Sequence, residues 1–182
     1  MSDRRIVVAQ SDALPPGRLA ELTALCEAAF GESFATAWEH VGPGLHVMAE
    51  VGGRLVSHAM IVDRRLYLGA EPDLALDAGY VEHVATWPDF QRSGHGATVM
   101  REIRRILADE YAIGALATGD NAFYEQLGWE TWRGPTFVRM PDGERVRSDS
   151  EDGHVMVLRT ERTPPVDLAA PIAVEWRARE PW

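Results

Sequence analysis

One short segment of the sequence has the residue types needed to bind phosphate groups. It contains two glycines among small and polar neighbours, in the order Gln91, Arg92, Ser93, Gly94, His95, Gly96 and Ala97. The segment joins an expected strand to an expected helix, where unpaired N–H groups and the positive end of the helix dipole attract phosphate oxygens. Arg92 is either an added cation or a solvated loop residue. A Gly-x-Gly sequence before a helix can also serve only to let the backbone turn. The segment alone therefore predicts a phosphate cradle and does not identify the ligand.

Two better-known phosphate-binding motifs do not match this segment. A Walker-type loop requires Gly-Lys-Ser/Thr, and the chain contains no lysine. A dinucleotide-binding fingerprint requires a third small residue where Val99 stands, and an acidic residue at the end of the next strand. The lack of lysine also excludes a mechanism that proceeds through a lysine Schiff base.

The strand that precedes the segment carries a carboxylate among apolar residues. Strand alternation places Tyr80, Glu82 and Val84 on one face and His83 on the other. A carboxylate in such a run is costly to bury without a purpose or a partner. Glu82 is therefore a candidate general base, with a structural ion pair to an arginine as the alternative.

The remaining candidate functional residues are one tyrosine, the single cysteine and the histidines. Tyr124 falls in an expected short helix, where its phenol could protonate a leaving group or serve only in packing. Cys26, the single cysteine, lies on an apolar helix stripe and is expected to be buried and structural. No metal-ligand spacing occurs among the histidines, which are His40, His46, His58, His83, His95 and His154. We therefore expect no metal site.

Composition restricts the partners of the chain. Its 18 basic residues, all arginine, against 28 acidic ones give a net charge of −10, which disfavours nucleic acid and anionic membranes because both require clustered cations. A cationic small molecule is the more natural partner. The apolar run at the start is too short for a secretory signal and no run approaches spanning length, so a cytoplasmic location is expected. The 182 residues, 46% of them hydrophobic, predict one domain over residues 1–182.

The pattern of apolar residues predicts the elements that position these groups. Strands are expected at 6–9, 45–51, 54–68, 77–87, 113–117, 131–140, 154–159 and 172–176. Helices are expected at 15–30, 36–40, 96–111 and 121–127. Gly52-Gly53 should form a two-residue hairpin, and the polar stretch 141–152 a loop. This order predicts a mixed α/β (α+β) fold with helices packed on a central sheet.

The chain resembles the GNAT superfamily of acetyltransferases, whose acetyl-CoA motif Gln/Arg-x-x-Gly-x-Gly/Ala is matched from Gln91 to Gly96. More closely, it is similar to the aminoglycoside 2'-N-acetyltransferases. The segments that carry this second resemblance are 37–40, 79–82, 127–129, 133–136 and 175–182. The resemblance implies a mostly antiparallel central sheet flanked by helices and acetyl-CoA or coenzyme A as the cofactor. A homodimer is compatible with it.

The resemblance also implies roles for individual residues in a ternary complex, in which the antibiotic amine attacks the thioester directly. Glu82 matches the base, and Tyr124 matches the acid that protonates the departing thiolate. The backbone groups that bind the pantetheine arm and polarise the acetyl carbonyl correspond to Val84, Ala85 and Thr86. The α-carboxylate of Trp182 matches a ligand of the substrate that also assists the base.

The acceptor site implied by the resemblance is acidic. Its candidate substrate-binding residues are Glu32, Ser33, Glu82, His83, Glu151, Asp152, Glu180 and Trp182. Each acid taken singly could instead be a solvated surface group. Ser33 and Ala37 stand where acids are usual in the relatives, and His83 stands where a small residue is usual. The alternatives to a common aminoglycoside are therefore kasugamycin, a polyamine, a peptide amine, or cofactor binding by a non-catalytic sensor.

Overall fold

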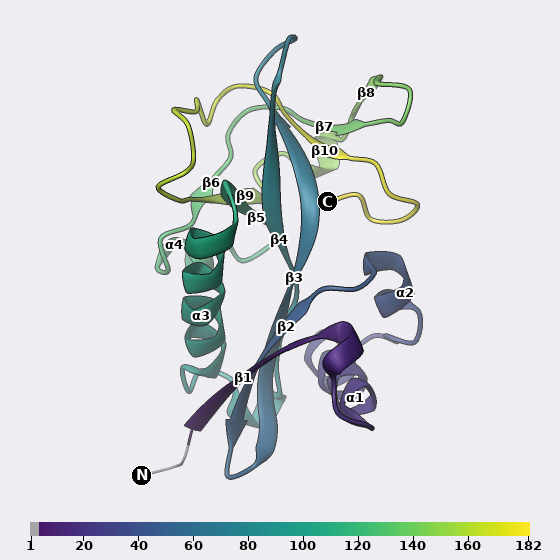
Figure 1. The fold of residues 1–182 in the computed structure, drawn as a ribbon, viewed down its shortest axis with the longest axis vertical. Helices are drawn as coiled ribbons and strands as arrows, with labels where there is room; N and C mark the ends of the chain where they lie inside the picture. The colour runs from purple at the N-terminus through teal and green to yellow at the C-terminus, as the bar shows by residue number, and fades with distance from the viewer. Residues whose placement is uncertain (1–3) are drawn as a thin grey trace. The chain divides into compact units, whose positions relative to one another are not determined.

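The structure is a computed structural model that describes residues 4–182 in two compact units. The first unit contains residues up to 62 and 81–105, and the second contains residues 63–80 and 106–182. Three elements run from one unit into the other: β3 (Arg54–Leu68), β4 (Leu74–Thr86) and α3 (His95–Glu110) (Figure 1). Within residues 4–182, no helix is both long enough and apolar enough to cross a membrane.

The first unit is built around an antiparallel sheet. β1 (Arg4–Gln10) pairs with β2 (Leu45–Val51), and β2 pairs with the first part of β3. Val51 and Arg54 are partners across Gly52 and Gly53, whose φ angles are 58° and 80°. Glycine adopts such angles without a steric cost, which suits it to a two-residue hairpin. The predicted hairpin is confirmed.

One helix of the first unit packs its apolar face into the core. α1 (Arg18–Phe30) and α2 (Ala37–Val41) follow β1 and the 3₁₀ turn η1 (Ser11–Ala13). α1 buries Leu22, Leu25 and Cys26 completely, in a cluster that includes Phe34. Burial, with the nearby carboxylate of Glu27, raises the pKa of the Cys26 thiol to about 12. The thiol is therefore protonated at neutral pH, and Cys26 is a buried structural residue as predicted.

The second unit contains a mixed sheet with the strand order β6-β9-β5-β4-β3-β10-β7-β8. Its shorter strands are β5 (Ile113–Ala117), β6 (Glu130–Thr131), β7 (Thr136–Arg139), β8 (Arg145–Arg147), β9 (Val155–Arg159) and β10 (Ile172–Glu175). The β4–β5 and β7–β10 pairs are parallel, whereas β5–β9, β6–β9, β7–β8 and β3–β10 are antiparallel. A mixed, mostly antiparallel sheet with helices is thereby confirmed.

Between residues 131 and 152 the structure differs from the prediction. The sequence predicts one strand over 131–140, but β6 and β7 are separate strands: β6 pairs with β9, whereas β7 pairs with β8 and β10, and Gly134-Pro135 lies between them. A Cβ atom on Gly134 would lie 1.9 Å from the carbonyl oxygen of Ala170, so the chain packs directly against this glycine. The stretch 141–152, predicted as a loop, contains β8 and the 3₁₀ turn η3 (Asp149–Glu151). β8 is mostly charged, so no apolar alternation indicates it.

Candidate functional site

The predicted phosphate cradle lies at the connection between β4 and α3, after the 3₁₀ turn η2 (Pro88–Phe90). α3 begins at His95, so the first N–H groups of the helix lack partners within it. The φ angles of Arg92 and Gly94 are 55° and 78°, and they turn the chain just before the helix starts. The side-chain amide of Gln91 donates to the carbonyl of Thr86 at 3.2 Å. Residues 91–97 therefore form a tight turn at a helix N-terminus, the geometry that an anion requires.

Two arginines lie at this turn and at the start of α3. Arg92 is exposed, and Arg4 of β1 donates to Thr98 Oγ1 in the first turn of α3 at 2.9 Å. Burial, with the nearby Arg4 charge, lowers the pKa of His95, so its imidazole is neutral at pH 7. Residues 91–97 include no carboxylate. Arg4 was not a sequence-based candidate, because its position in β1 does not reveal which helix it meets.

Glu82 and His83 lie half-buried near the end of β4. His83 has a φ of 53°, a left-handed conformation that costs a non-glycine residue on the order of 1 kcal/mol. The strict alternation assumed from the sequence therefore does not continue past this residue. Buried side chains reach the carbonyls of this segment: His58 Nδ1 lies 3.1 Å from His83 O, and Ser57 Oγ donates to Ala85 O at 3.0 Å.

Sequence reasoning passed over two buried histidines that lie beside His83. His58 is completely buried and His46 is 1% exposed, and His46 Nδ1 lies 3.0 Å from His58 Nε2. Phe34 and Trp38 contact the His83 ring edge-on, with centroids 4.6 and 4.9 Å away. The sequence did contain a signal for them, because both histidines stand within apolar strand segments. Burying an imidazole there is unfavourable unless it is hydrogen-bonded. Within residues 4–182, no three His, Cys, Asp or Glu side chains are grouped as metal ligands.

Tyr124 lies in α4 (Asn121–Glu125) of the second unit. Its side chain is buried, and its ring contacts that of Trp129 edge-on at a centroid distance of 6.2 Å. Burial, with the nearby Asp120 charge, raises the pKa of Tyr124 to about 12, against the opposing effect of a hydrogen bond with Thr118. The phenol is therefore protonated at neutral pH, as a proton donor must be.

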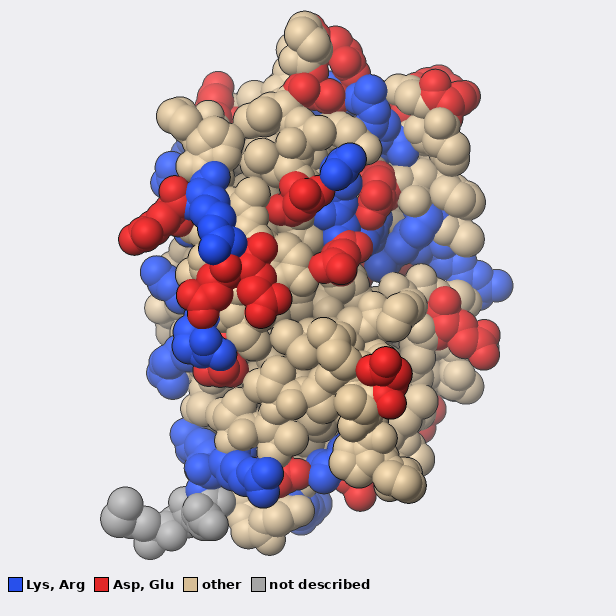
Figure 2. All heavy atoms as spheres, viewed as in Figure 1, with Lys and Arg blue, Asp and Glu red and all other residues tan. Residues whose placement is uncertain are grey.

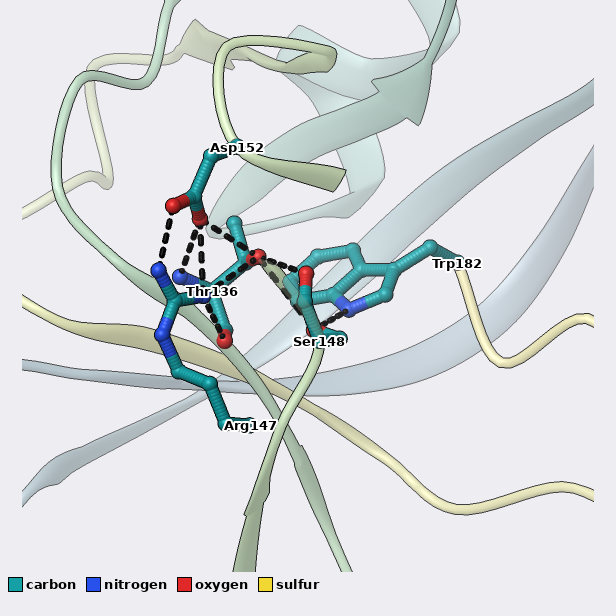
Figure 3. Close-up of polar contacts among 5 residues, drawn as sticks. All are labelled: Thr136, Arg147, Ser148, Asp152 and Trp182. Carbon is teal, nitrogen blue, oxygen red and sulfur yellow. Dashed lines mark hydrogen bonds and ion pairs between the residues drawn. The ribbon is translucent and has the colours of Figure 1, made fainter. Parts of the chain in front are cut away.

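A chain of hydrogen bonds in the second unit holds Trp182 (Figure 3). Trp182 Nε1 donates to Ser148 Oγ at 2.9 Å, and Ser148 Oγ donates to Thr136 Oγ1 at 3.2 Å. The carboxylate of Asp152 accepts from Thr136 and from both terminal nitrogens of Arg147. The Arg147 guanidinium, followed by the Thr136 bonds, holds the pKa of Asp152 well below its usual range. Asp152, a predicted substrate ligand, is thus engaged in fixing the segment that carries Ser148.

A cavity of about 380 Å³ lies against Trp182. Glu151 and Glu180 place two carboxylates in its lining, and the remaining lining residues are Val138, Ser148, Ser150 and Pro181. The volume is in the range of small-molecule sites. Two carboxylates beside an indole suit a small polar cation.

The other predicted substrate residues lie elsewhere in the chain. Glu32 and Ser33 are exposed residues of the first unit, in the connection between α1 and α2. Ser33 Oγ accepts a long hydrogen bond of 3.5 Å from the N–H of Ala35. Of the predicted acceptor residues, the structure gathers Glu151, Glu180 and Trp182 around one cavity.

Surface charge is mixed but has an acidic excess. Figure 2 shows basic side chains beside many of the acidic ones on the face drawn. Arg65 pairs with Asp77 at 2.7 Å, and Arg139 pairs with Glu71 at 3.0 Å. Such pairs neutralise charge locally and contribute little stability when exposed. The excess of 28 acidic over 18 basic residues nevertheless leaves a field that attracts cations.

Known proteins provide matches over most of the chain. Residues 13–132 match the family model described as an acetyltransferase (GNAT) domain. The chain is also 36% identical over 158 residues to an aminoglycoside 2'-N-acetyltransferase from Mycolicibacterium fortuitum, and this match covers 85% of the chain and 80% of that protein.

Solved structures share the fold. A GNAT family N-acetyltransferase (YhbS) from Escherichia coli, in complex with CoA, matches with a TM-score of 0.66 and 17% identity, over 97% of this chain and 91% of that one. A GCN5-related N-acetyltransferase from Kribbella flavida matches with a TM-score of 0.59 and 22% identity, over 74% of this chain. The match covers only 34% of the Kribbella protein, so this chain spans about a third of its length.

Proposed function

The chain belongs to the GNAT family of acetyltransferases, and we propose that it transfers the acetyl group of acetyl-CoA to the 2'-amine of an aminoglycoside. The observation that carries the proposal is the 36% identity over 158 residues to an aminoglycoside 2'-N-acetyltransferase. The acidic cavity beside Trp182 supports an acceptor that is small, polar and cationic. In this function the whole chain acts as one catalytic domain.

The cofactor is assigned to the end of β4 and the turn that follows it. The helix N-terminus at residues 91–97, with Arg92 exposed and Arg4 bound to the first turn of α3, fits the pyrophosphate of CoA. The parallel pairing of β4 with β5 covers Ala78 to Tyr80, so Val84 and Thr86 lie beyond its last pair. Their backbone groups are suited to hydrogen-bond an extended pantetheine arm in the manner of an added strand.

Glu82 is assigned the role of general base. Acetyl-CoA supplies an acetyl group activated as a thioester. An ammonium group has no lone pair, so it must first lose a proton, which Glu82 accepts directly or through water. The N–H of Val84 then stabilises the negative charge that develops on the carbonyl oxygen as the C–N bond forms.

Tyr124 is assigned the role of general acid. Its pKa of about 12 keeps the phenol protonated until the C–S bond breaks, when the departing sulfur takes the proton. The attacking nitrogen loses its second proton to solvent as the amide forms. Solvent then restores the proton to Tyr124 and removes the one on Glu82. The overall transfer releases one proton, because an ammonium becomes a neutral amide while the thioester becomes a thiol.

The acceptor is assigned to the cavity beside Trp182. Glu151 and Glu180 are positioned there to bind ammonium groups, and the indole of Trp182 offers a face for a cationic sugar. The bonds from Arg147 through Asp152 hold this wall of the cavity in place. The role of the Trp182 α-carboxylate stays a prediction.

The test is acetyl-CoA-dependent thiol release by the purified protein with matched acceptors. Each pair of aminoglycosides differs only in an amine or a hydroxyl at the 2' position, and kasugamycin, a polyamine and a peptide amine complete the panel. We expect release with the 2'-amine member of each pair and none with its 2'-hydroxyl partner. Equal release with both members, or release only with a polyamine or peptide, would contradict the assignment of the acceptor. Binding of acetyl-CoA without release by any amine would indicate a non-catalytic sensor.

A further inference from the structure

The carbonyl of His83 is hydrogen-bonded by a buried side chain. His58 Nδ1 lies 3.1 Å from His83 O, and the His58 ring is completely buried. A carbonyl oxygen has no proton to give, so His58 Nδ1 carries the proton and donates it. In a neutral ring the other nitrogen, Nε2, is then an acceptor.

Two further residues extend this bond into a chain. His46 Nδ1 lies 3.0 Å from His58 Nε2, and because that nitrogen accepts, His46 Nδ1 donates. His46 Nε2 is therefore an acceptor as well, and Ser11 Oγ lies 3.0 Å from it. The Ser11 hydroxyl is anchored by the N–H of Gly44, which donates to it at 2.9 Å, and its own proton can go to His46 or to Gly44 O. When the Ser11 hydroxyl donates to His46, every hydrogen bond is donated in the direction from Ser11 to His83.

Burial keeps both imidazoles in the neutral form that this arrangement requires. It lowers the pKa of His46 to about 4, and it lowers the pKa of His58 well below its ordinary value, with the neighbouring histidines adding to the effect. The indole of Trp38 packs on both rings, with centroids 5.7 and 5.9 Å away. At neutral pH neither ring carries a second proton, so each ring keeps one nitrogen that can accept a hydrogen bond.

The chain of hydrogen bonds ends at the peptide group that joins His83 to Val84. This peptide is trans, so its C=O and N–H point in opposite directions, and the N–H of Val84 faces away from His58. A hydrogen bond accepted by the C=O draws electron density from the group and makes its N–H a stronger donor. The same bond holds the peptide in its orientation next to the left-handed backbone of His83.

We propose that Ser11, His46 and His58 are positioning residues that orient and polarise the His83–Val84 peptide, so that the N–H of Val84 binds the thioester carbonyl more strongly. The inference rests on the proposed function, in which that N–H binds this carbonyl. An oxyanion donor of this kind is worth about 10²- to 10³-fold in turnover, and a bonded neighbour strengthens a hydrogen bond by roughly 10–30%. Loss of the His58 bond should therefore lower kcat about threefold.

The test replaces His58 with phenylalanine, which keeps the shape of the ring and removes its donor. In the free protein, the Val84 amide proton should move upfield in the NMR spectrum. With acetyl-CoA labelled with ¹³C at the carbonyl, the infrared stretch of the bound thioester should move to higher frequency. The Kd for CoA should be unchanged, because free CoA has no acetyl carbonyl for the N–H of Val84 to bind.

Two more variants separate the hydrogen bond from a general loss of packing. His58→Asn retains a donor near the position of Nδ1 and should restore most of both shifts. His46→Phe leaves the His58 bond in place and breaks the chain one step earlier, so it should give smaller shifts in the same direction. Leu25→Ala, in the apolar core of the same unit, lowers the melting temperature without removing a hydrogen bond and should leave both signals unmoved.

The outcomes distinguish this inference from the function on which it rests. Native signals in His58→Phe, or shifts equal to those of Leu25→Ala, would overturn the inference and leave the acetyltransferase assignment standing. If the bound thioester of the native protein has the frequency of free acetyl-CoA, Val84 does not bind the carbonyl, and the inference falls with that role. The expected result is a lowered native frequency that His58→Phe raises and His58→Asn restores.

Discussion

His46 should make the protein sensitive to mild acid, and replacing it should reduce that sensitivity. The imidazole is 1% exposed, and burial lowers its pKa from 6.5 to about 4. Between these values the unfolded chain binds a proton that the folded protein does not bind. The contribution of His46 to the free energy of unfolding therefore has its full value above pH 6.5. It decreases as the pH falls from 6.5 towards 4.

The size of the effect follows from the change in pKa. A tenfold change in proton affinity is worth about 1.4 kcal/mol, so the complete loss is about 3 kcal/mol, of which about 2 kcal/mol has occurred by pH 5. Carboxylates and the buried His58 also contribute to the loss of stability in acid, but they do so in the native protein and in the variant alike. The difference between the two proteins isolates the imidazole.

The assay is urea unfolding of the native protein, His46→Phe and His154→Phe at pH 7.5 and pH 5. His154 is exposed and serves as the matched histidine control. We expect the native protein and His154→Phe to lose about 2 kcal/mol more than His46→Phe does between the two pH values. Equal losses in all three proteins would refute the claim that His46 is held neutral by burial.

Three further predictions concern the catalytic and structural roles assigned above. Glu82→Gln should lower turnover about 10²-fold near neutral pH, with the deficit shrinking as the pH rises and the free amine becomes abundant; a pH profile parallel to that of the native enzyme would remove Glu82 as the base. Glu180→Gln should raise the KM of the acceptor several-fold and leave the Kd of CoA unchanged, whereas Glu161→Gln, an exposed acid outside the cavity lining, should change neither; equal effects of the two variants would argue against the cavity as the acceptor site. Gly134→Ala should destabilise the fold by about 3 kcal/mol, because its Cβ would meet Ala170 O at 1.9 Å. Gly94→Ala should cost only about 1 kcal/mol, since its φ of 78° is strained but its surroundings are open. Denaturant unfolding measures both glycine variants, and a larger loss for Gly94→Ala would contradict this order.

The features predicted well from the sequence are those whose cause lies within a few residues. Gly52 and Gly53 require positive φ angles in a two-residue hairpin, and their sequence already indicates it. Cys26 and the leucines of α1 are spaced three or four residues apart, and this helical spacing indicates the buried face of α1. The turn at residues 91–97 joins a strand to an amphipathic helix, so its place at a helix N-terminus follows from local pattern alone.

The features that sequence reasoning missed depend on contacts between distant parts of the chain. Arg4 reaches Thr98, which is 94 positions away. His46 and His58 become one hydrogen-bonded unit only when the pairing of β2 with β3 brings their side chains together. No local rule predicts that the mostly charged β8 will be a strand, because its backbone bonds to β7 decide it.

The left-handed conformation of His83 was also beyond the sequence. A residue with a Cβ atom adopts a φ of 53° only where its surroundings compensate the cost. Those surroundings are Phe34 in the connection between α1 and α2, the indole of Trp38 in α2 and the imidazole of His58 in β3. The strand assignment from 77 to 87 was correct in outline, but the sequence could not show where the strand is distorted.

The most direct test of the account is the structure of the product. The purified protein is incubated with acetyl-CoA and one aminoglycoside that has several amines, including one at the 2' position, and the product is analysed by mass spectrometry and two-dimensional NMR. The account predicts a single added acetyl group on the 2'-nitrogen. An acetyl group on any other nitrogen or on an oxygen, or an unmodified aminoglycoside, would contradict it.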